Sequence, residues 1–275
     1  MVILIQCADQ VGLVATIAAI LSEQHINIVA MREHVDTQEN RFFVRLETEG
    51  ETNKQLLQVR LEAALPPQAQ IILDPAPQKK IVVLVTKEYH CLGDILLRHH
   101  FQTLGAEVAA VIGNHLVLED ICKRFEVPFT FLSHEEKSKA VFEAELMEQI
   151  EKHQPDYIVL AKFMRILSPE FVERYIQRII NIHHSFLPAF VGANPYKQAY
   201  ERGVKLIGAT AHFVTNQLDE GPIIAQQIIQ VTHSFTTSKM VRAGKEIETA
   251  VLAKALQLVF EDRVLLHKNK TIIFE

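Results

Sequence analysis

The sequence predicts an α/β protein in two parts, a small ferredoxin-like unit followed by a doubly wound, mostly parallel sheet. Residues 1–73 follow the order β-α-β-β-α-β, which is the ferredoxin-like pattern. A polar, proline-bearing break covers 74–80 and has the composition of a linker. Beyond the break, apolar strands alternate with helices, which indicates a parallel sheet. We therefore expect domains at 1–73 and 81–275, joined by that linker.

Hydrophobic spacing distinguishes helices from strands in the first part. Val14, Ile17 and Leu21 recur at intervals of three and four residues, which predicts a helix over 12–24. Thr52 is placed to cap a second helix that ends before a pair of prolines, because the residue before a proline disfavours helical geometry. The expected strands cover 2–6, 26–35, 41–49 and 69–73.

The second part is expected to begin with a strand at 81–86, because a near-continuous apolar run is typical of a strand buried on both faces. Residues 216–222 join two apolar runs into an antiparallel hairpin. Thr236 or Thr237 caps a long helix that continues to about Asp262. The remaining strands are expected at 107–112, 129–132, 157–161, 178–183, 207–215, 223–231 and 271–274, and the remaining helices at 91–104, 116–124, 135–152, just after 168, and 194–202.

Composition narrows the class of protein. Hydrophobic residues make up 48% of the chain and charged residues 22%, as in a globular protein with a substantial core. The formal net charge is -5 without a long block of one sign, so neither nucleic acid nor a membrane is an expected partner. No apolar run reaches the roughly 20 residues of a membrane helix, and the apolar start is too short for a signal peptide. The three cysteines show no C-x-x-C pattern, which fits a reducing compartment, so we expect a cytoplasmic protein.

Polar side chains gather where a predicted strand ends. Asn181 and His183 are two residues apart, so both side chains point to one face of that strand, and Asp219 lies at the tip of the predicted hairpin. An amide, an imidazole and a carboxylate are the groups needed to promote attack on a carbonyl and to stabilise the oxyanion that forms. We expect a partly apolar loop to raise the pKa of Asp219 toward neutrality. The structural alternative makes Asn181 a strand-end cap and His183 a hydrogen-bonded core histidine.

Other candidate groups have structural explanations. The loop at 86–94 contains one glycine, so neither a dinucleotide nor a nucleoside triphosphate is expected to bind there. Cys91, near a helix N-terminus, is either a nucleophile or a structural cysteine, and we favour the structural role. His212 is expected to be a core or supporting histidine. His183, His184 and His212 lack the spacing of metal ligands, and no metal is expected.

The segment 164–167 follows another predicted strand. One interpretation is a packing segment with a surface arginine. The other is a binding loop whose backbone amides meet a planar ring while Arg165 binds a carboxylate, for which a guanidinium is well suited.

Four motifs occur in chain order: M-R-I-L at 164–167, N-I-H-x-S-x-L-P at 181–188, H-F-V at 212–214 and L-D-x-G-P at 218–222. On these motifs the chain resembles the formyltetrahydrofolate deformylase family over nearly its full length. The resemblance implies a folate-binding loop at 164–167 and catalytic roles for Asn181, His183 and Asp219. It implies no cofactor, because 10-formyltetrahydrofolate is the substrate. Substrate contacts are implied for Met164, Arg165, Ile166, Leu167, His212, Val214 and Leu218.

Departures from the related transferases favour the deformylase branch. Transferases that formylate glycinamide ribonucleotide carry a phosphate loop with glycine and asparagine after the first strand, whereas 85–94 has no such pattern. His184 stands where those transferases have proline, and the stretch from Gly192 and Ala193 to Gly203 looks like the deformylases.

The first part resembles an ACT domain, an amino-acid-sensing fold that the deformylases carry and the transferases lack. Asp9, Gly12 and Asn27 correspond to positions where that fold holds its ligand. The resemblance implies an amino-acid effector, glycine or methionine, and a homo-oligomer in which ACT domains pair side by side.

The resemblance implies hydrolysis of 10-formyltetrahydrofolate to tetrahydrofolate and formate, which supplies formate and balances one-carbon folate pools for purine synthesis. One alternative is a formyltransferase that uses the same folate with an amine acceptor such as glycinamide ribonucleotide. Another is a non-catalytic folate or amino-acid sensor built on the ACT domain. The three polar residues favour catalysis, and the missing phosphate loop favours water as the acceptor.

Overall fold

The computed structural model describes residues 1–76, 78–189 and 195–275. Pro77 of the expected linker, and Gly192 and Ala193 of the deformylase-like stretch, lie outside the described residues. The chain forms two compact units, Met1–Pro77 with Asp262–His267 and Ile272–Glu275, and Gln78–Glu261 with Lys268–Thr271. Among the helices that are described, none combines the length and the apolar content needed to cross a membrane.

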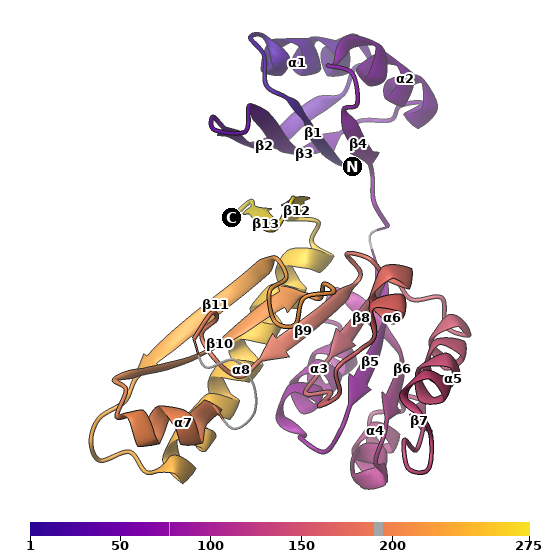
Figure 1. The fold of residues 1–275 in the computed structure, drawn as a ribbon. Helices are drawn as coiled ribbons and strands as arrows, with labels where there is room; N and C mark the ends of the chain where they lie inside the picture. The colour runs from indigo at the N-terminus through magenta and orange to yellow at the C-terminus, as the bar shows by residue number, and fades with distance from the viewer. Residues whose placement is uncertain (77, 190–194) are drawn as a thin grey trace. The chain divides into compact units, whose positions relative to one another are not determined.

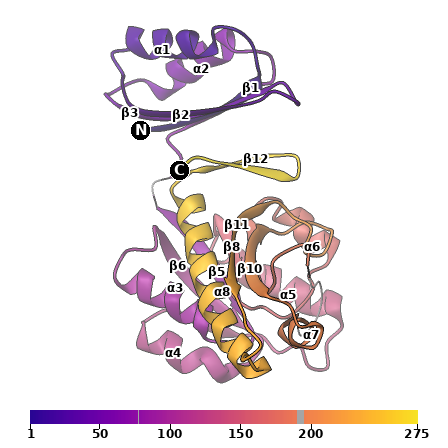
Figure 2. The same ribbon diagram turned by 90° about the vertical axis from the view of Figure 1, so that its left-hand side faces the viewer.

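The first unit has the expected ferredoxin-like order. Its antiparallel sheet has the strand order β2-β3-β1-β4, and both helices cover one face of it (Figures 1 and 2). Leu21 of the first helix and Leu61 of the second pack on Ile5 and Val44 of the sheet. The elements are β1 (Val2–Ala8), α1 (Leu13–Glu23), β2 (Asn27–Asp36), β3 (Arg41–Glu49), α2 (Lys54–Ala64) and β4 (Gln70–Leu73).

The other face of this sheet is covered by a C-terminal hairpin, where the sequence predicted a single short strand. The hairpin consists of β12 (Val264–His267) and β13 (Lys270–Ile273). Leu4 and Phe43 alternate with the residues that face the helices, so they point the other way and pack against Leu265 and Phe274. Residues near the C-terminus therefore belong with the first unit, although the sequence pattern places all of 81–275 together.

Two predicted helix caps can be compared with the structure. Asn53, not Thr52, caps α2, because its side chain accepts a hydrogen bond from the Leu56 amide at 3.1 Å. The Thr52 hydroxyl instead donates to Gln24 at 2.7 Å. Thr236 caps the long helix α8 (Thr237–Phe260), as expected for one of the two threonines proposed.

The second unit is built on a sheet with the strand order β11-β10-β9-β8-β5-β6-β7. Its strands are parallel from β9 to β7, and β10 and β11 add an antiparallel edge, so the predicted mostly parallel sheet is confirmed. The elements are β5 (Lys79–Val85), α3 (His90–His100), β6 (Ala106–Gly113), the 3₁₀ turn η1 (Leu116–Leu118), α4 (Glu119–Arg124), β7 (Phe129–Phe131), α5 (Lys139–Glu151), β8 (Tyr157–Leu160), α6 (Pro169–Arg174), β9 (Ile179–His183), α7 (Pro195–Arg202), β10 (Leu206–Phe213), β11 (Ile223–Gln230) and α8.

Helices cover both faces of this sheet (Figure 2). The helices α3 and α8 pack together on one face, whereas Phe142 and Leu146 of α5 and Phe171 of α6 pack on Leu84 and Leu160 of the other face. In chain order, β5, β6 and β7 extend the sheet in one direction, and β8, β9, β10 and β11 then extend it in the other direction from β5. The carboxyl ends of β5 and β8 therefore form the switch point, where open α/β sheets commonly bind ligands.

Candidate active site

Strand β9 presents two of the predicted catalytic residues on one face. Asn181 and His183 alternate with Ile180 and Ile182, which are buried on the opposite face. In the neighbouring strand β10, His212 lies opposite Asn181 and Thr210 lies opposite His183. The register of two strands thus brings these polar side chains together, because directly opposed residues in a sheet are close neighbours.

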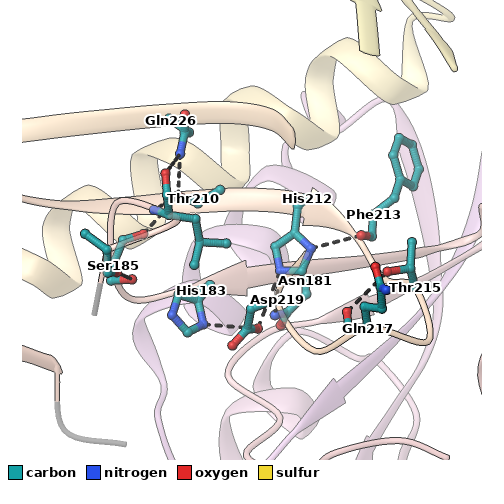
Figure 3. A network of polar contacts seen from close by, with 12 residues as sticks. Asn181, His183, Ser185, Thr210, His212, Phe213, Thr215, Gln217, Asp219 and Gln226 are labelled. Carbon is teal, nitrogen blue, oxygen red and sulfur yellow. Dashed lines mark hydrogen bonds and ion pairs between the residues drawn. The ribbon is translucent and has the colours of Figure 1, made fainter. Parts of the chain in front are cut away.

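His212 orients the amide of Asn181. The Nδ1 atom of His212 donates to the Phe213 carbonyl at 2.9 Å, so its Nε2 atom accepts from Nδ2 of Asn181 at 3.2 Å (Figure 3). Burial lowers the pKa of His212, so this neutral tautomer is favoured. The pairing of β10 with β11 is irregular between Ala211 and His212, whereas the pairing of β10 with β9 is regular there and keeps His212 opposite Asn181. His212 is therefore the supporting histidine that the sequence predicted.

Asp219 lies between the two histidines. Its Oδ1 atom is 3.3 Å from Nδ1 of His183 and 3.8 Å from Nε2 of His212 (Figure 3). Burial alone would raise the pKa of Asp219, but the hydrogen bond from His183 and the fields of the neighbouring histidines hold that pKa below its usual value. The expected shift toward neutrality is wrong, because the polar neighbours of the carboxylate outweigh the apolar part of its loop. Asp219 is ionised at neutral pH.

A close backbone approach at Gly221 brings the Asp219 loop to the sheet. A Cβ atom at this position would lie 1.7 Å from the carbonyl oxygen of Phe213, so only glycine fits. The Phe213 amide donates to the Pro222 carbonyl at 2.9 Å and holds the loop in place. Asp219 itself has a φ of 58°, a left-handed conformation that aspartate tolerates better than most residues.

The three polar groups line one pocket with a volume of about 290 Å³. All ten residues that the sequence analysis assigned to catalysis or substrate contact line it. The Nε2 atom of His183 is buried and has no hydrogen-bond partner among the described residues. A buried imidazole nitrogen without a partner is costly unless a ligand or water pairs with it.

The segment 164–167 forms one wall of this pocket. The Met164 amide donates to the Thr86 hydroxyl at 3.0 Å, and the Arg165 guanidinium lies 5.1 Å from the centre of the Phe142 ring. Met164 and Ile166 are exposed by 56% and 62%, a large apolar area for a loop. Exposed apolar side chains beside an arginine suit a planar ligand that carries an acid.

The loop after His183 is fixed by residues that the sequence analysis missed. The Thr210 hydroxyl donates to the Ser185 carbonyl at 2.9 Å and accepts from the Leu187 amide at 3.1 Å. Gln226 donates to the same hydroxyl at 2.9 Å (Figure 3). The sequence does contain a signal for Thr210, because it is two residues before His212 on one strand and so shares its face.

Two further predictions are addressed by the structure. Cys91 is 1% exposed and its thiol pKa is raised, chiefly by burial and then by the charge of Glu248, so the structural role holds. Asp9 and Gly12 lie beyond the end of β1 that pairs with Arg41, whereas Asn27 pairs with Glu49 at the other end of the sheet. One chain therefore does not bring the three predicted effector residues together.

Comparison with known proteins decides the family. Residues 79–256 match the formyl transferase family model, and residues 1–63 match the ACT domain model. A formyltetrahydrofolate deformylase from Escherichia coli is 51% identical over 267 residues, which cover 97% of this chain and 95% of that protein. The chain belongs to the formyltetrahydrofolate deformylase family.

Solved structures agree with this family and with its relation to transferases. The crystal structure of a family member from Pseudomonas syringae has a TM-score of 0.94 and 38% identity, and the match covers 100% of this chain and 94% of that one. A glycinamide ribonucleotide transformylase from Symbiobacterium toebii has a TM-score of 0.70 and 30% identity, with 73% of this chain and 96% of that one covered. The family thus shares a core with the transferases and has additional chain.

Proposed function

We propose that this chain hydrolyses 10-formyltetrahydrofolate to tetrahydrofolate and formate in the pocket that Asn181, His183 and Asp219 line. The observation that supports this most directly is the convergence of an amide, an unpartnered imidazole nitrogen and an ionised carboxylate on one pocket. The activity is that of relatives about half identical over nearly the full length.

Each group has a separate role in this reaction. Asn181 Nδ2 and His183 Nε2 donate to the formyl oxygen as it gains negative charge. Asp219 accepts a proton from water while the water oxygen bonds to the formyl carbon. The bond from that carbon to N10 then breaks, and N10 takes the proton that Asp219 received. Formate leaves as an anion, and the remaining proton of the attacking water goes to solvent.

Substrate binding follows the two kinds of surface in the pocket. The apolar side chains of Met164, Ile166 and Leu218 suit the pterin ring and its aryl extension. Arg165, at the same wall, suits the glutamate carboxylate of the folate. The reaction fits the cytoplasm, because the three cysteines are free and buried.

The direct test is incubation of the purified protein with 10-formyltetrahydrofolate and measurement of free formate. Formate should appear without any amine in the solution. Formyl transfer to glycinamide ribonucleotide at a rate that rivals hydrolysis would instead support the transferase alternative, and absence of both products would support the sensor.

Asn181→Ala tests the role of the amide. Loss of an oxyanion donor typically lowers kcat by about 10²–10³-fold. We expect a fall of that size with a nearly unchanged KM, measured by steady-state formate release. A rise in KM at constant kcat would assign Asn181 to ground-state binding only.

We also infer that the ACT unit binds a small effector such as glycine or methionine and pairs with a second copy. The support is the family model over residues 1–63. Because Asp9 and Asn27 lie at opposite ends of one sheet, an effector site that uses both requires two chains. Light scattering tests the pairing of two copies, and formate release with and without each amino acid tests the effector. A monomer whose formate release is unchanged by both amino acids would contradict both inferences.

A further inference from the structure

A second group of polar side chains is buried beside Asn181, His183 and Asp219, which we call the triad. The Glu248 cluster consists of Glu248, His90, Lys162 and Tyr196. Both carboxylate oxygens of Glu248 are occupied, since Oε1 accepts from the Tyr196 hydroxyl at 2.7 Å and Oε2 from His90 Nε2 at 2.8 Å. The Lys162 ammonium lies 3.1 Å from the same Oε2. The side chains of Glu248 and Lys162 are 2% and 8% exposed, so two charges are removed from water.

Two local features of the chain accommodate this cluster, a left-handed backbone at Lys162 and a glycine at position 244. Lys162 has a φ of 63°, a left-handed conformation that favours glycine, yet a lysine stands there. Gly244, one helical turn before Glu248 on α8, leaves room for Tyr196, because a Cβ atom at Gly244 would lie 2.2 Å from the tyrosine hydroxyl. A buried ion pair contributes little to the net stability of a fold, so stability alone does not explain why Lys162 and Glu248 are paired here.

The position of the cluster suggests that reason. His90 follows β5 and Lys162 follows β8, so the cluster lies at the switch point of the sheet, where such folds usually leave a crevice for a ligand. Here the protein's own side chains meet at that position. Lys162 also lines the triad pocket, so the cluster borders the reaction centre.

His184 connects the cluster to the triad. Its ring centre is 5.2 Å from that of His183 and 6.1 Å from that of Tyr196. It lines the triad pocket and also a second pocket that Tyr196 lines. Burial and then the positive charge of Lys162 lower the pKa of His184 to about 4, so at neutral pH it is an uncharged imidazole.

A metal ion is a poorer explanation of the cluster. His90, Cys91 and Glu248 place three possible ligand atoms within 4.8 Å of one another. The Lys162 ammonium already neutralises Glu248, and burial keeps the Cys91 thiol protonated. A cation at this point would be repelled by the lysine and would lack a thiolate ligand.

We propose that Lys162, anchored by Glu248, and His184 form the acceptor side of the reaction centre and restrict it to water. Both side chains line the pocket that Asn181, His183 and Asp219 line, so both border the place that a nucleophile must reach to attack the formyl carbon. The inference rests on the proposed hydrolysis and assigns its choice of acceptor to named residues.

Removal of the Lys162 side chain should let an amine reach the formyl carbon. In Lys162→Gly the ammonium is gone, the left-handed backbone suits the new residue, and the Glu248 carboxylate is left to accept an N–H group. A primary amine would then reach the formyl carbon, form the new C–N bond, and lose a proton as the bond to N10 breaks and N10 is protonated. The product would be a formylated amine in place of formate.

The test uses the full-length protein, 10-formyltetrahydrofolate and glycinamide as a small primary amine. The measured quantity is the ratio of formylglycinamide to formate, which does not depend on how much of each variant is folded. We expect a ratio at least tenfold higher in Lys162→Gly than in the wild type. His184→Ala, which removes the ring between cluster and triad, should raise the ratio as well and covers the case in which the first variant does not fold.

Lys137→Gln is the matched control, because it breaks the pair between Lys137 and Glu145, which lie outside the pocket lining. Its ratio should equal that of the wild type. An unchanged ratio in folded Lys162→Gly and His184→Ala, or equal formylation of glycinamide by the wild type, would overturn the proposal. Absence of formate from the wild type would instead contradict the proposed hydrolysis.

Discussion

The substitution Asp219→Asn tests the centre of the proposed mechanism, because it removes a charge and keeps the shape of the side chain. His183 carries a positive charge when it donates from Nδ1 to Asp219 and from Nε2 to the oxyanion. The carboxylate side chain is 9% exposed and 3.3 Å from that ring. At this distance and an effective dielectric constant of about 20, a charge pair is worth roughly 5 kcal/mol.

The expected loss of activity follows from that interaction. Because about 1.4 kcal/mol corresponds to a tenfold change in rate, kcat should fall by about 10³–10⁴-fold. KM should change little, since the wall formed by 164–167 is untouched. Steady-state formate release over a range of 10-formyltetrahydrofolate concentrations up to saturation measures both constants, and circular dichroism checks the fold.

Glu220→Gln is the control, because Glu220 is the exposed neighbour of Asp219 in the same loop. We expect its kcat to stay within about twofold of the wild type, as for most surface substitutions. The reasoning fails if correctly folded Asp219→Asn retains more than about a tenth of the wild-type kcat, since the charge would then contribute less than about 1.4 kcal/mol.

Three other predictions concern packing, thiols and acid. Gly221→Ala should strongly reduce kcat, because the added Cβ would lie 1.7 Å from the Phe213 carbonyl oxygen. In Gly93→Ala, which serves as the control, the added Cβ would have no atom within 4 Å, so the free energy of unfolding should rise by about 0.5–1 kcal/mol, as thermal unfolding would show. The three buried cysteines should resist Ellman's reagent in the native protein and react after denaturation; fast native labelling would contradict their burial. Burial alone would raise the pKa of Glu248, but its three donors lower it to about 2, so its stabilising contribution is present above the unfolded pKa of about 4.3 and is lost as pH falls toward about 2. Glu248→Gln should therefore show a smaller drop in Tm between about pH 5 and 2 than the wild type, and equal slopes would contradict this.

Local patterns in the sequence predict one part of the site and not the other. Asn181 and His183 share a face because of the two-residue period of a strand, which the sequence shows directly. The pKa of Asp219 depends on His183 and His212, which come from two other strands, so loop composition alone predicts its direction wrongly.

The Glu248 cluster was missed for a related reason. One signal was present, since Glu248 interrupts the buried stripe that Ile247, Val251 and Leu252 form on α8. A charge in such a stripe indicates a buried partner, but the spacing does not say which one. The partners come from α3, from the segment after β8 and from α7, and only the three-dimensional fold brings these together.

The C-terminal hairpin also affects which side chains of the first unit can be buried during synthesis of the chain. Leu4 and Phe43 leave the ribosome early, but Leu265 and Phe274, which cover them, are made only after residues 78–261. Domains usually fold as they emerge, with the N-terminal one first. The core between the sheet and its two helices consists of residues from 1–73 and can form as soon as they are made. Leu4 and Phe43 on the other face stay uncovered until Leu265 and Phe274 are made, so the nascent chain exposes them while residues 78–261 are translated.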